Sequence, residues 1–282
     1  MKILAIGAHQ DDNEFRVGGM ALKWTRAGHT VQFLSMCNGC GGHHIMTPEE
    51  TSARRARESA EVAKFIGIKY DIWSDVDDCT LMADLETRYR LIRYIREFSP
   101  DLIITHRTND YHADHRAAAQ LVQDASYLLT VPHTCPDTPA MKRMPVIAFY
   151  EDKFKIPPFT ATYVMSIDDV IDDKLYIAHL NTSQVYEWLA YENDLVVPEG
   201  DKERFEWLKG MNITAQTGDE EVNNAGRGYA VRYAKTAARF RNELIKHYGE
   251  EKGSRVRFAE AFEISEYGRQ VYKELEEALF SF

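Results

Sequence analysis

Several features that would assign this 282-residue sequence to a common class are missing. No apolar run approaches the roughly 20 residues that a membrane-spanning helix needs, and no signal peptide precedes the first apolar segment. The chain has four cysteines, Cys37, Cys40, Cys79 and Cys135. Such sparse cysteine in a chain of this length does not indicate a disulfide framework. We therefore expect a cytoplasmic protein without a membrane span.

Positive charge is in deficit. The chain has 34 Lys and Arg residues against 44 Asp and Glu residues, which gives a formal net charge of −10. A negative overall field repels phosphate backbones and anionic membranes, so nucleic acid is not an expected partner. A negative net charge does not exclude a local pocket of positive charge. We expect the partner to be a small molecule. The oligomeric state is not encoded in any pattern that we recognise.

A glycine-rich phosphate loop is also missing after the first apolar segment. Residues 3–15 read ILAIGAHQDDNEF, with a single Gly7 followed by a histidine and several acids. A dinucleotide-binding oxidoreductase needs G-x-G-x-x-G at this position, and these acids would repel a pyrophosphate. The opening segment therefore excludes that class and poses the question of what the His and Asp residues do.

The chain does contain an alternation of apolar strand-like segments and amphipathic helical segments. The expected strands are 2–8, 30–36, 70–73, 101–106, 146–151 and 162–167. The expected helices are 18–28, 47–68, 82–98, 113–129, 168–193, 230–248 and 266–279, with a polar loop and a short helix in 197–228. This alternation predicts one α/β domain over residues 1–282, with a mostly parallel sheet and a less regular C-terminal part.

Two His/Asp clusters follow expected strands. His9 and Asp12 come after the first strand, and His112, Asp114 and His115 come after the strand at 101–106. Taken alone, the first cluster is about as consistent with a helix cap as with a metal site, and the second cluster favours a helix cap. Together they lie at the carboxyl ends of parallel strands, where open α/β sheets bind ligands. The pair of clusters favours one divalent metal ion, zinc or another first-row metal, held by His9, Asp12 and His115.

The remaining polar residues suggest catalytic roles. Three protein ligands leave positions open for water, whose pKa zinc lowers to about 7. Asp11 lies beside a ligand and is expected to take the proton of that water. His112 is expected to stabilise an oxyanion or to protonate a leaving amine. Asp114 is expected to orient the His112 ring and to raise its pKa.

These motifs resemble the PIG-L/LmbE-type zinc deacetylases. The segment GAHQDDNEFRVGGMAL resembles the family's A-H-P-D-D-x-E-F opening, and THRTNDYHADHRAA resembles its second motif. RRARESAEVAKFIGI, SIDDVIDDKLYIAHLNTSQ and FAEAFEI are similar to later family segments, in the same order. The resemblance implies a Rossmann-like fold with helices on both faces of the sheet and hydrolysis of N-acetyl groups, usually on N-acetylglucosamine units.

The same resemblance implies roles for individual residues. Zinc ligands would be His9, Asp12 and His115, the general base would be Asp11, and His112 would be the oxyanion or acid partner with Asp114 orienting it. Arg55 would match an arginine that some members use to hold substrate. Gln10 departs from the family because it replaces the usual proline, which makes the turn less rigid.

Other interpretations stay open from the sequence. The segment CNGCGGHH (37–44) is consistent with a second zinc site or a redox pair, but an ordinary glycine-rich loop is favoured because only one C-x-x-C is present. The expected function is removal of an N-acyl group from an amino sugar or glycoconjugate. The alternatives are a two-metal phosphoesterase and a metal- or sugar-binding protein of the same fold without catalysis.

Overall fold

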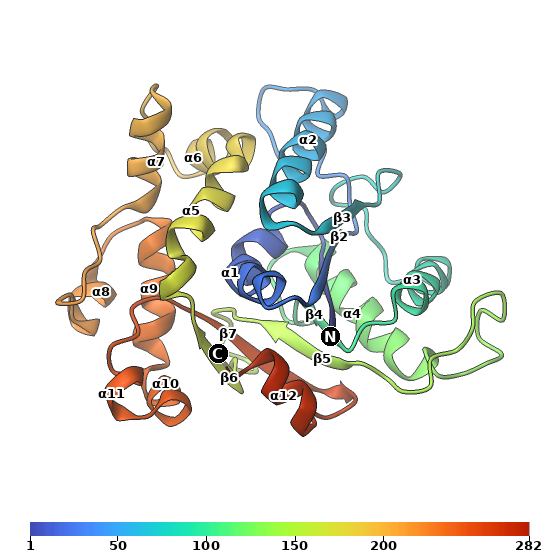
Figure 1. Cartoon of the computed structure of the whole chain (residues 1–282). Coiled ribbons are helices and arrows are strands. Elements are labelled where there is room, and N and C mark those ends of the chain that lie inside the picture. Colours follow the sequence, from blue (N-terminus) through green and yellow to red (C-terminus); the bar gives the residue numbers. More distant parts are fainter. Residues whose placement is uncertain (282) are drawn as a thin grey trace.

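The computed structural model describes residues 1–281 and contains a seven-stranded sheet between layers of helices (Figure 1). The strand order is β3-β2-β1-β4-β5-β7-β6. The strands are β1 (Lys2–Gly7), β2 (Thr30–Ser35), β3 (Lys69–Ile72), β4 (Leu102–Thr105), β5 (Val146–Tyr150), β6 (Tyr163–Ser166) and β7 (Ala259–Gly268). Strands β1 to β5 are parallel, and β7 is antiparallel to both of its neighbours. The expected fold class is confirmed.

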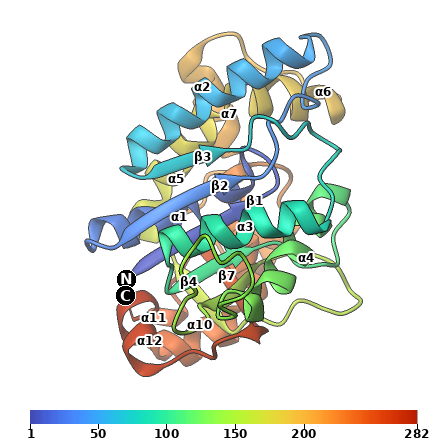
Figure 2. The same cartoon turned by 90° about the vertical axis from the view of Figure 1, so that its right-hand side faces the viewer.

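Helices cover both faces of this sheet. Those of the first half are α1 (Asp12–Arg26), α2 (Pro48–Ile66), α3 (Leu85–Phe98) and α4 (Ala113–Leu128). Those of the second half are η1 (Asp168–Val170), α5 (Ile171–Leu180), η2 (Ser183–Trp188), α6 (Leu189–Glu192), α7 (Asp201–Lys209), α8 (Asp219–Asn224), α9 (Tyr229–Arg239), α10 (Arg241–Tyr248), α11 (Glu250–Gly253) and α12 (Lys273–Leu279). Figure 2 looks onto α3 and α4, with strands behind them. Within residues 1–281, no helix has the length and apolar character needed to cross a membrane.

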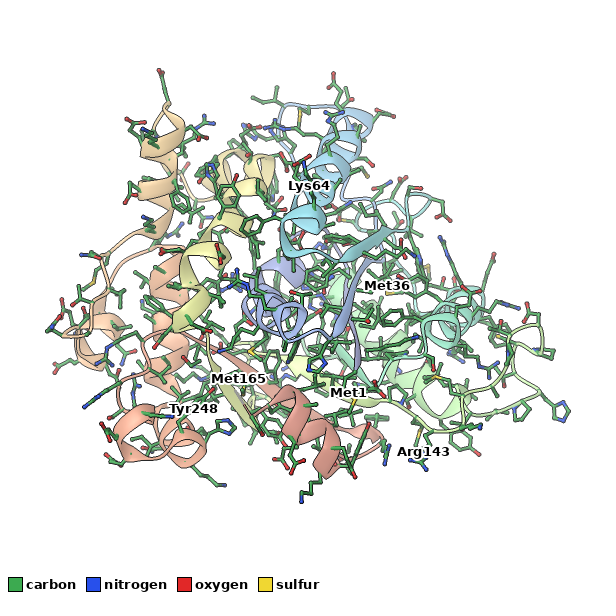
Figure 3. All side chains as sticks on the ribbon, viewed as in Figure 1. Met1, Met36, Lys64, Arg143, Met165 and Tyr248 are labelled. Carbon is green, nitrogen blue, oxygen red and sulfur yellow. The ribbon has the colours of Figure 1, made fainter. Side chains whose placement is uncertain are left out.

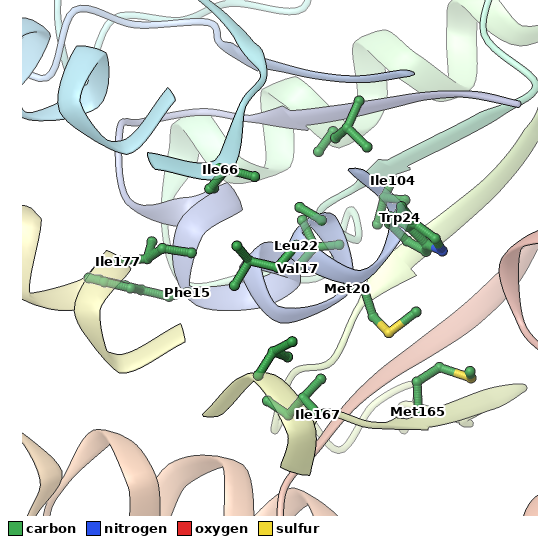
Figure 4. Close-up of a cluster of buried hydrophobic side chains, with 14 of the residues drawn as sticks. Phe15, Val17, Met20, Leu22, Trp24, Ile66, Ile104, Met165, Ile167 and Ile177 are labelled. Atoms are coloured by element: carbon green, nitrogen blue, oxygen red, sulfur yellow. The ribbon is translucent and has the colours of Figure 1, made fainter. Parts of the chain in front are cut away.

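Strand β1 explains why the sequence opens with a continuous apolar run. Ile3 and Ala5 face a cluster that includes side chains of α1, α5 and α12, whereas Leu4 and Ile6 face a second cluster with α3 and α4. Figure 4 shows part of the first cluster, with Phe15 and Met20 of α1 and Ile177 of α5. A parallel strand with helices on both sides must be apolar on both faces. Burial of each such Ile or Leu side chain contributes about 1.5–3 kcal/mol. Figure 3 labels Met165, from the first cluster, and Met36, from the second.

A buried ion pair fixes α1 against the second half of the chain. Lys174 Nζ on α5 lies 2.6 Å from Glu260 Oε1 on β7, and both side chains are buried. Glu260 also accepts hydrogen bonds of 2.9 Å from the backbone N–H groups of Gly19 and Met20. A Cβ atom at Gly19 would lie 2.8 Å from Ile167 Cγ2, so glycine permits this close approach. The helix that carries Asp12 is thereby held in place.

Several expected element boundaries were wrong. Helix α1 begins at Asp12 rather than residue 18, because the polar residues after β1 are buried and helical rather than an exposed loop. The segment expected as a helix from residue 266 is strand β7 up to Gly268, whose φ of 86° ends the strand. The expected helix 168–193 is broken by Asn181 and continues as the π-helical η2. The loop 197–228 contains two short helices, α7 and α8.

Candidate metal centre

The two His/Asp clusters meet where the strand order reverses. The chain leaves β1 towards β2 on one side and leaves β4 towards β5 on the other, and the carboxyl ends of such strands are where open α/β sheets bind ligands. His9 follows β1, and His115 lies in the first turn of α4 after β4. Gly7 is required at the end of β1, because a Cβ atom there would lie 2.7 Å from the Cβ of Asp12. The sheet topology therefore brings residues about 100 positions apart into one site.

Hydrogen bonds orient both predicted imidazole ligands. His9 Nε2 lies 2.8 Å from Asp78 Oδ1 and 3.0 Å from Asp114 Oδ2. His115 Nδ1 lies 2.9 Å from Asp110 Oδ1. A carboxylate that accepts the N–H of one ring nitrogen leaves the other nitrogen available for a metal. Those available nitrogens are Nδ1 of His9 and Nε2 of His115.

Both available nitrogens face Asp12. Its Oδ2 lies 3.7 Å from His9 Nδ1, and its Oδ1 lies 3.3 Å from His115 Nε2. Metal–ligand bonds of about 2.1 Å in tetrahedral geometry separate ligand atoms by about 3.4 Å. Both separations are close to this value, and the assignment of His9, Asp12 and His115 as one ligand set stays a prediction. Among residues 1–281, three groups have donor atoms close enough together to share one metal ion, and none of them contains all three predicted ligands. These groups are His9, His112 and His115; His9, Asp78, His112 and Asp114; and Asp12, His106 and His115.

The charges of the site match this assignment. Burial lowers the pKa of His9, but hydrogen bonds to Asp114 and Asp78 outweigh burial and raise it to about 10. Burial raises the pKa of Asp12, but the charges of His115 and His106 hold it well below its usual range. A bound cation would replace the proton on His9, because metal ligands must be deprotonated. The carboxylates that favour a proton here also favour a divalent ion.

Asp11 is held in an unusual conformation beside this centre. Its φ of 103° lies in a region that non-glycine residues rarely adopt and that is found at functional sites. The side chain is buried, and burial raises its pKa to about 6 despite the opposing charge of Arg55, whose Nη2 lies 3.4 Å from Asp11 Oδ1. Arg55 also donates to the carbonyl oxygens of Gln10 and Gly39. The structure places Arg55 against Asp11, and its role in holding substrate stays a prediction.

Gln10 stands where the sequences that the opening motif resembles have proline, and side-chain contacts nevertheless fix the turn here. Its side chain is buried, and its Nε2 donates to the carbonyl of Asn38 at 3.0 Å. Gly39, with a φ of 70°, packs against it, and a Cβ atom there would lie 2.3 Å from Gln10 Oε1. The turn before Asp11 is therefore fixed by the loop after β2.

The environment of His112 differs from the expectation. His112 Nδ1 accepts the backbone N–H of Asp114 at 3.1 Å, whereas the Asp114 carboxylate contacts His9 and the backbone N–H groups of Cys79 and Leu81. Burial and the charges of His9 and His115 lower the pKa of His112, and Asp114 only partly opposes them. The expectation that the pKa of His112 lies above its free value was wrong, because burial and the charges of His9 and His115 outweigh the increase that Asp114 causes. An acceptor at Nδ1 leaves the proton of a neutral His112 on Nε2.

Four buried or half-buried residues of the site escaped the sequence analysis: Glu14, Asp78, His106 and Asp110. His106 directly follows β4, and its Nε2 lies 3.1 Å from Asp12 Oδ2. Burial lowers the pKa of His106 to about 4. The position of His106 at a strand end was a usable signal. Asp78 lies in an acidic loop after β3 that had no such signal, because its contact with His9 depends on the sheet order.

The loop 37–44 packs around the centre rather than forming a second one. Cys37 is buried with its Sγ 3.6 Å from Asp114 Oδ2, and His43 Nε2 lies 2.8 Å from Glu187 Oε2. Burial raises the pKa of Cys40, which disfavours the thiolate that binds metal. Among residues 1–281, the groups with metal-ligand spacing contain no cysteine. These contacts accord with the favoured glycine-rich loop.

Comparison with known proteins now adds the family. The PIG-L profile, described as GlcNAc-PI de-N-acetylase, matches residues 4–126, which run from β1 to α4 and include every predicted site residue. The resemblance noted in the sequence is confirmed, and the candidate metal cluster lies inside the segment that matches the PIG-L family.

Proteins that are similar to this chain differ in their activities. A Pseudomonas putida protein named 4-oxalmesaconate hydratase is 24% identical over 196 residues, which cover 67% of this chain and 76% of the relative. Diacetylchitobiose deacetylase of Thermococcus kodakarensis is 25% identical over 227 residues, which cover 75% and 82%. The solved N,N'-diacetylchitobiose deacetylase of Pyrococcus horikoshii has a TM-score of 0.64 at 21% identity, and the match covers 94% of this chain and 83% of that one. Deacetylation and hydration both occur among similar proteins.

Proposed function

We propose that this protein is a zinc-dependent hydrolase that cleaves an N-acyl group from an amino-sugar-containing small molecule. The observation that carries the proposal is the paired orientation of His9 and His115, whose available nitrogens face Asp12. When bound there, zinc supplies a Lewis acid for the acyl carbonyl and a water with a pKa near 7. Another divalent ion with the same donor preference is the alternative occupant.

The residues of the chain supply the proton transfers. Asp11 is buried next to Asp12, and its pKa of about 6 suits a general base near neutral pH. It takes the proton of the attacking water and passes it to the leaving amine. His112, with its Nδ1 held by the Asp114 backbone, presents Nε2–H as a donor for the developing oxyanion. Amide hydrolysis then yields a carboxylate and a free amine.

The direct test is amine release by the purified protein after zinc loading. A panel of N-acyl amino sugars is incubated with the protein, and free amine is measured with a fluorogenic amine reagent. We expect turnover of at least one member and one zinc per chain by elemental analysis. His115→Ala should lose both zinc and turnover. Two metal ions per chain, together with hydrolysis of phosphate esters, would favour a phosphoesterase instead. Binding of a substrate without turnover would favour a binding protein without catalysis.

The hydratase relative makes hydration the second candidate function. A carboxylate base next to a metal also suits the addition of water to a carbon–carbon double bond. This candidate is tested with 4-oxalmesaconate, the compound in the relative's name, by following its ultraviolet absorbance. Loss of absorbance that depends on Asp11, together with no amine release across the panel, would replace the deacylase by a hydratase.

A further inference from the structure

Glu14, in the first turn of α1, is a buried carboxyl group without a cationic partner. Its side chain is fully buried, and within residues 1–281 it forms no ion pair. Oε2 accepts two hydrogen bonds of 3.1 Å, one from the backbone N–H of Asp11 and one from the hydroxyl of Tyr70. Oε1 has no hydrogen-bond partner among the residues that the structure describes. Burial of an unpaired carboxyl group costs free energy, so stability alone does not account for this group.

The hydrogen bond from Asp11 to Glu14 fixes one of the two peptide groups that flank Asp11. This peptide group joins Gln10 to Asp11. Its N–H donates to Glu14, and its carbonyl accepts a hydrogen bond from Arg55 Nη2 on α2. The peptide group on the other side of Asp11 is held through its carbonyl, which accepts the N–H of Phe15 at 2.8 Å. Contacts therefore fix the peptide planes on both sides of the candidate base.

These contacts matter because Asp11 has a backbone conformation that it would not keep by itself. Its φ of 103° lies outside the regions that non-glycine residues favour, and such strain persists only where the surroundings impose it. If α1 stays in place, a change to a negative φ requires the Gln10–Asp11 peptide group to turn over, because this group is planar. That movement would break the hydrogen bonds to both Glu14 and Arg55.

Glu14 is itself held from the sheet. Tyr70 on β3 donates to Glu14 Oε2, and the Tyr70 hydroxyl lies 2.9 Å from Oγ of Ser35 at the end of β2. The Tyr70 ring also packs edge-on against Phe33 of β2, with ring centroids 5.6 Å apart. Strands β3 and β2 are neighbours at one edge of the sheet (Figure 2). A chain of contacts thus connects these two strands to the backbone of Asp11.

We propose that Glu14 is a positioning residue that, supported by Tyr70, holds the carboxylate of Asp11 in the direction that a general base requires. The proposal rests on the proposed function and deepens it, since Glu14 is neither a predicted ligand nor the base. A general base must lie within hydrogen-bond reach of the proton that it takes. A displacement of about 1 Å in such a geometry can lower the rate by about 100-fold.

The first experiment compares Glu14→Met with Glu14→Gln. Methionine removes the acceptor, whereas glutamine keeps one oxygen for the Asp11 N–H and the Tyr70 hydroxyl. The zinc-loaded variants are assayed with the N-acyl amino sugar that the wild type cleaves fastest. We expect kcat of Glu14→Met to fall by roughly 10- to 100-fold, with KM and zinc content near the wild-type values, and Glu14→Gln to recover most of this loss. Equal losses in the two variants, or no loss in Glu14→Met, would overturn the proposal.

Tyr70→Phe removes only the contact that supports Glu14. Its kcat should fall with KM unchanged, but by less than in Glu14→Met, because Glu14 still accepts the N–H of Asp11. This variant keeps the buried carboxyl group and decides the question if Glu14→Met does not fold. An unchanged kcat in Tyr70→Phe would contradict the proposal.

Tyr94→Phe is the matched control. Tyr94 is half-buried like Tyr70, and its hydroxyl forms hydrogen bonds with the same two strands, to Asp71 on β3 at 2.8 Å and to Gln32 on β2 at 2.6 Å. These contacts do not lead to Asp11, so kcat should stay at the wild-type value. A decrease as large as that of Tyr70→Phe would assign the effect to general loosening of the two strands and would also overturn the proposal.

A crystal structure of Glu14→Met, or of Tyr70→Phe if the first variant does not fold, tests the positioning role without any substrate. We expect Asp11 to adopt a negative φ and its carboxylate to be displaced. This result in a protein that cleaves no member of the substrate panel would support the positioning role and reject the deacylase. Amine release by the wild type, together with a φ near 100° at Asp11 in the variant, would do the reverse.

Discussion

At the scale of single residues, Asp11 and Asp12 are adjacent but have opposite properties. Burial raises the pKa of Asp11 to about 6, whereas the charges of His115 and His106 keep Asp12 ionised despite its burial. Two neighbouring carboxylates with separated pKa values are suited to different roles, one as base and one as ligand. Asp11, whose φ is 103°, faces Arg55, whereas Asp12 faces His115 and His106.

The first prediction concerns Asp11→Asn. The variant should keep its zinc, because Asp11 is not one of the three proposed ligands, but its kcat should fall by roughly 10²–10⁴-fold. In the wild type the base must be ionised, so kcat/KM should fall as pH decreases through about 6, or somewhat lower where a bound cation favours the ionised form. Elemental analysis and a pH–rate profile measure both effects. Loss of zinc in the variant would make Asp11 a ligand.

The second prediction concerns His112→Gln. Because Nδ1 accepts a backbone N–H and the pKa of His112 is lowered, its neutral form should be the active one. Glutamine retains a donor to the oxyanion, so kcat should fall by less than in His112→Ala, and the basic limb of the pH profile should keep its position. A basic limb that disappears in His112→Gln would instead identify His112 as a protonated acid.

At the scale of elements, α1 depends on α5 and β7 for its position. The Lys174–Glu260 pair is the link, and it is buried at both ends. Gly18 and Gly19 allow the pair to approach α1, since a Cβ atom at Gly18 would lie 3.2 Å from Lys174 Nζ. Gly18 and Gly19, Lys174 and Glu260 belong to three separate sequence segments that resemble the family. In the structure these three segments meet at the Lys174–Glu260 pair.

The third prediction concerns Lys174→Met. Removal of the cation leaves Glu260 buried without its charged partner, which should lower the free energy of unfolding by about 3–5 kcal/mol. Urea unfolding followed by circular dichroism gives this value. The exposed Lys273→Met is the control and should change it by less than about 0.5 kcal/mol. The double variant Lys174→Met, Glu260→Gln should recover part of the loss, and no recovery would show that packing rather than charge dominates.

At the scale of the whole molecule, the single domain expected over residues 1–282 stays a prediction. Strand β1 contributes to the hydrophobic clusters on both faces of the sheet, and β7 from the second half pairs with β5 from the first. Unfolding of one part should therefore expose the core of the other. We expect one cooperative thermal transition, with coincident loss of near- and far-ultraviolet circular dichroism. Two separated transitions would divide the chain into two domains.

The last prediction concerns metal removal. The proposed ligands come from two distant chain segments, so zinc should bind the folded state far better than the unfolded one. At a free zinc concentration of 100 times Kd, binding adds about 2.7 kcal/mol to stability. A chelator should lower the melting temperature, zinc should restore it, and His115→Ala should abolish the difference. An unchanged melting temperature in a protein that retains stoichiometric zinc in the absence of chelator would contradict the ligand assignment.

The sequence by itself determined the parallel sheet, the family resemblance and the segments that carry the site. Apolar strands such as residues 2–8 and the polar residues after them are local patterns, and the polypeptide backbone converts such patterns directly into strands and strand ends. The rule that parallel strands present their carboxyl ends at one edge then placed His9, Asp12 and His115 together.

Only the tertiary structure decided which atoms face each other. The contact of Asp114 with His9 spans 105 positions and depends on strand order. Sequence proximity correctly indicated that Asp114 raises the pKa of His112, but it did not show the burial and the His9 and His115 charges that lower it by a larger amount. The contact of Asp78 with His9 has the same origin. Side-chain direction and burial set pKa values, and both arise from packing between distant segments rather than from spacing along the chain.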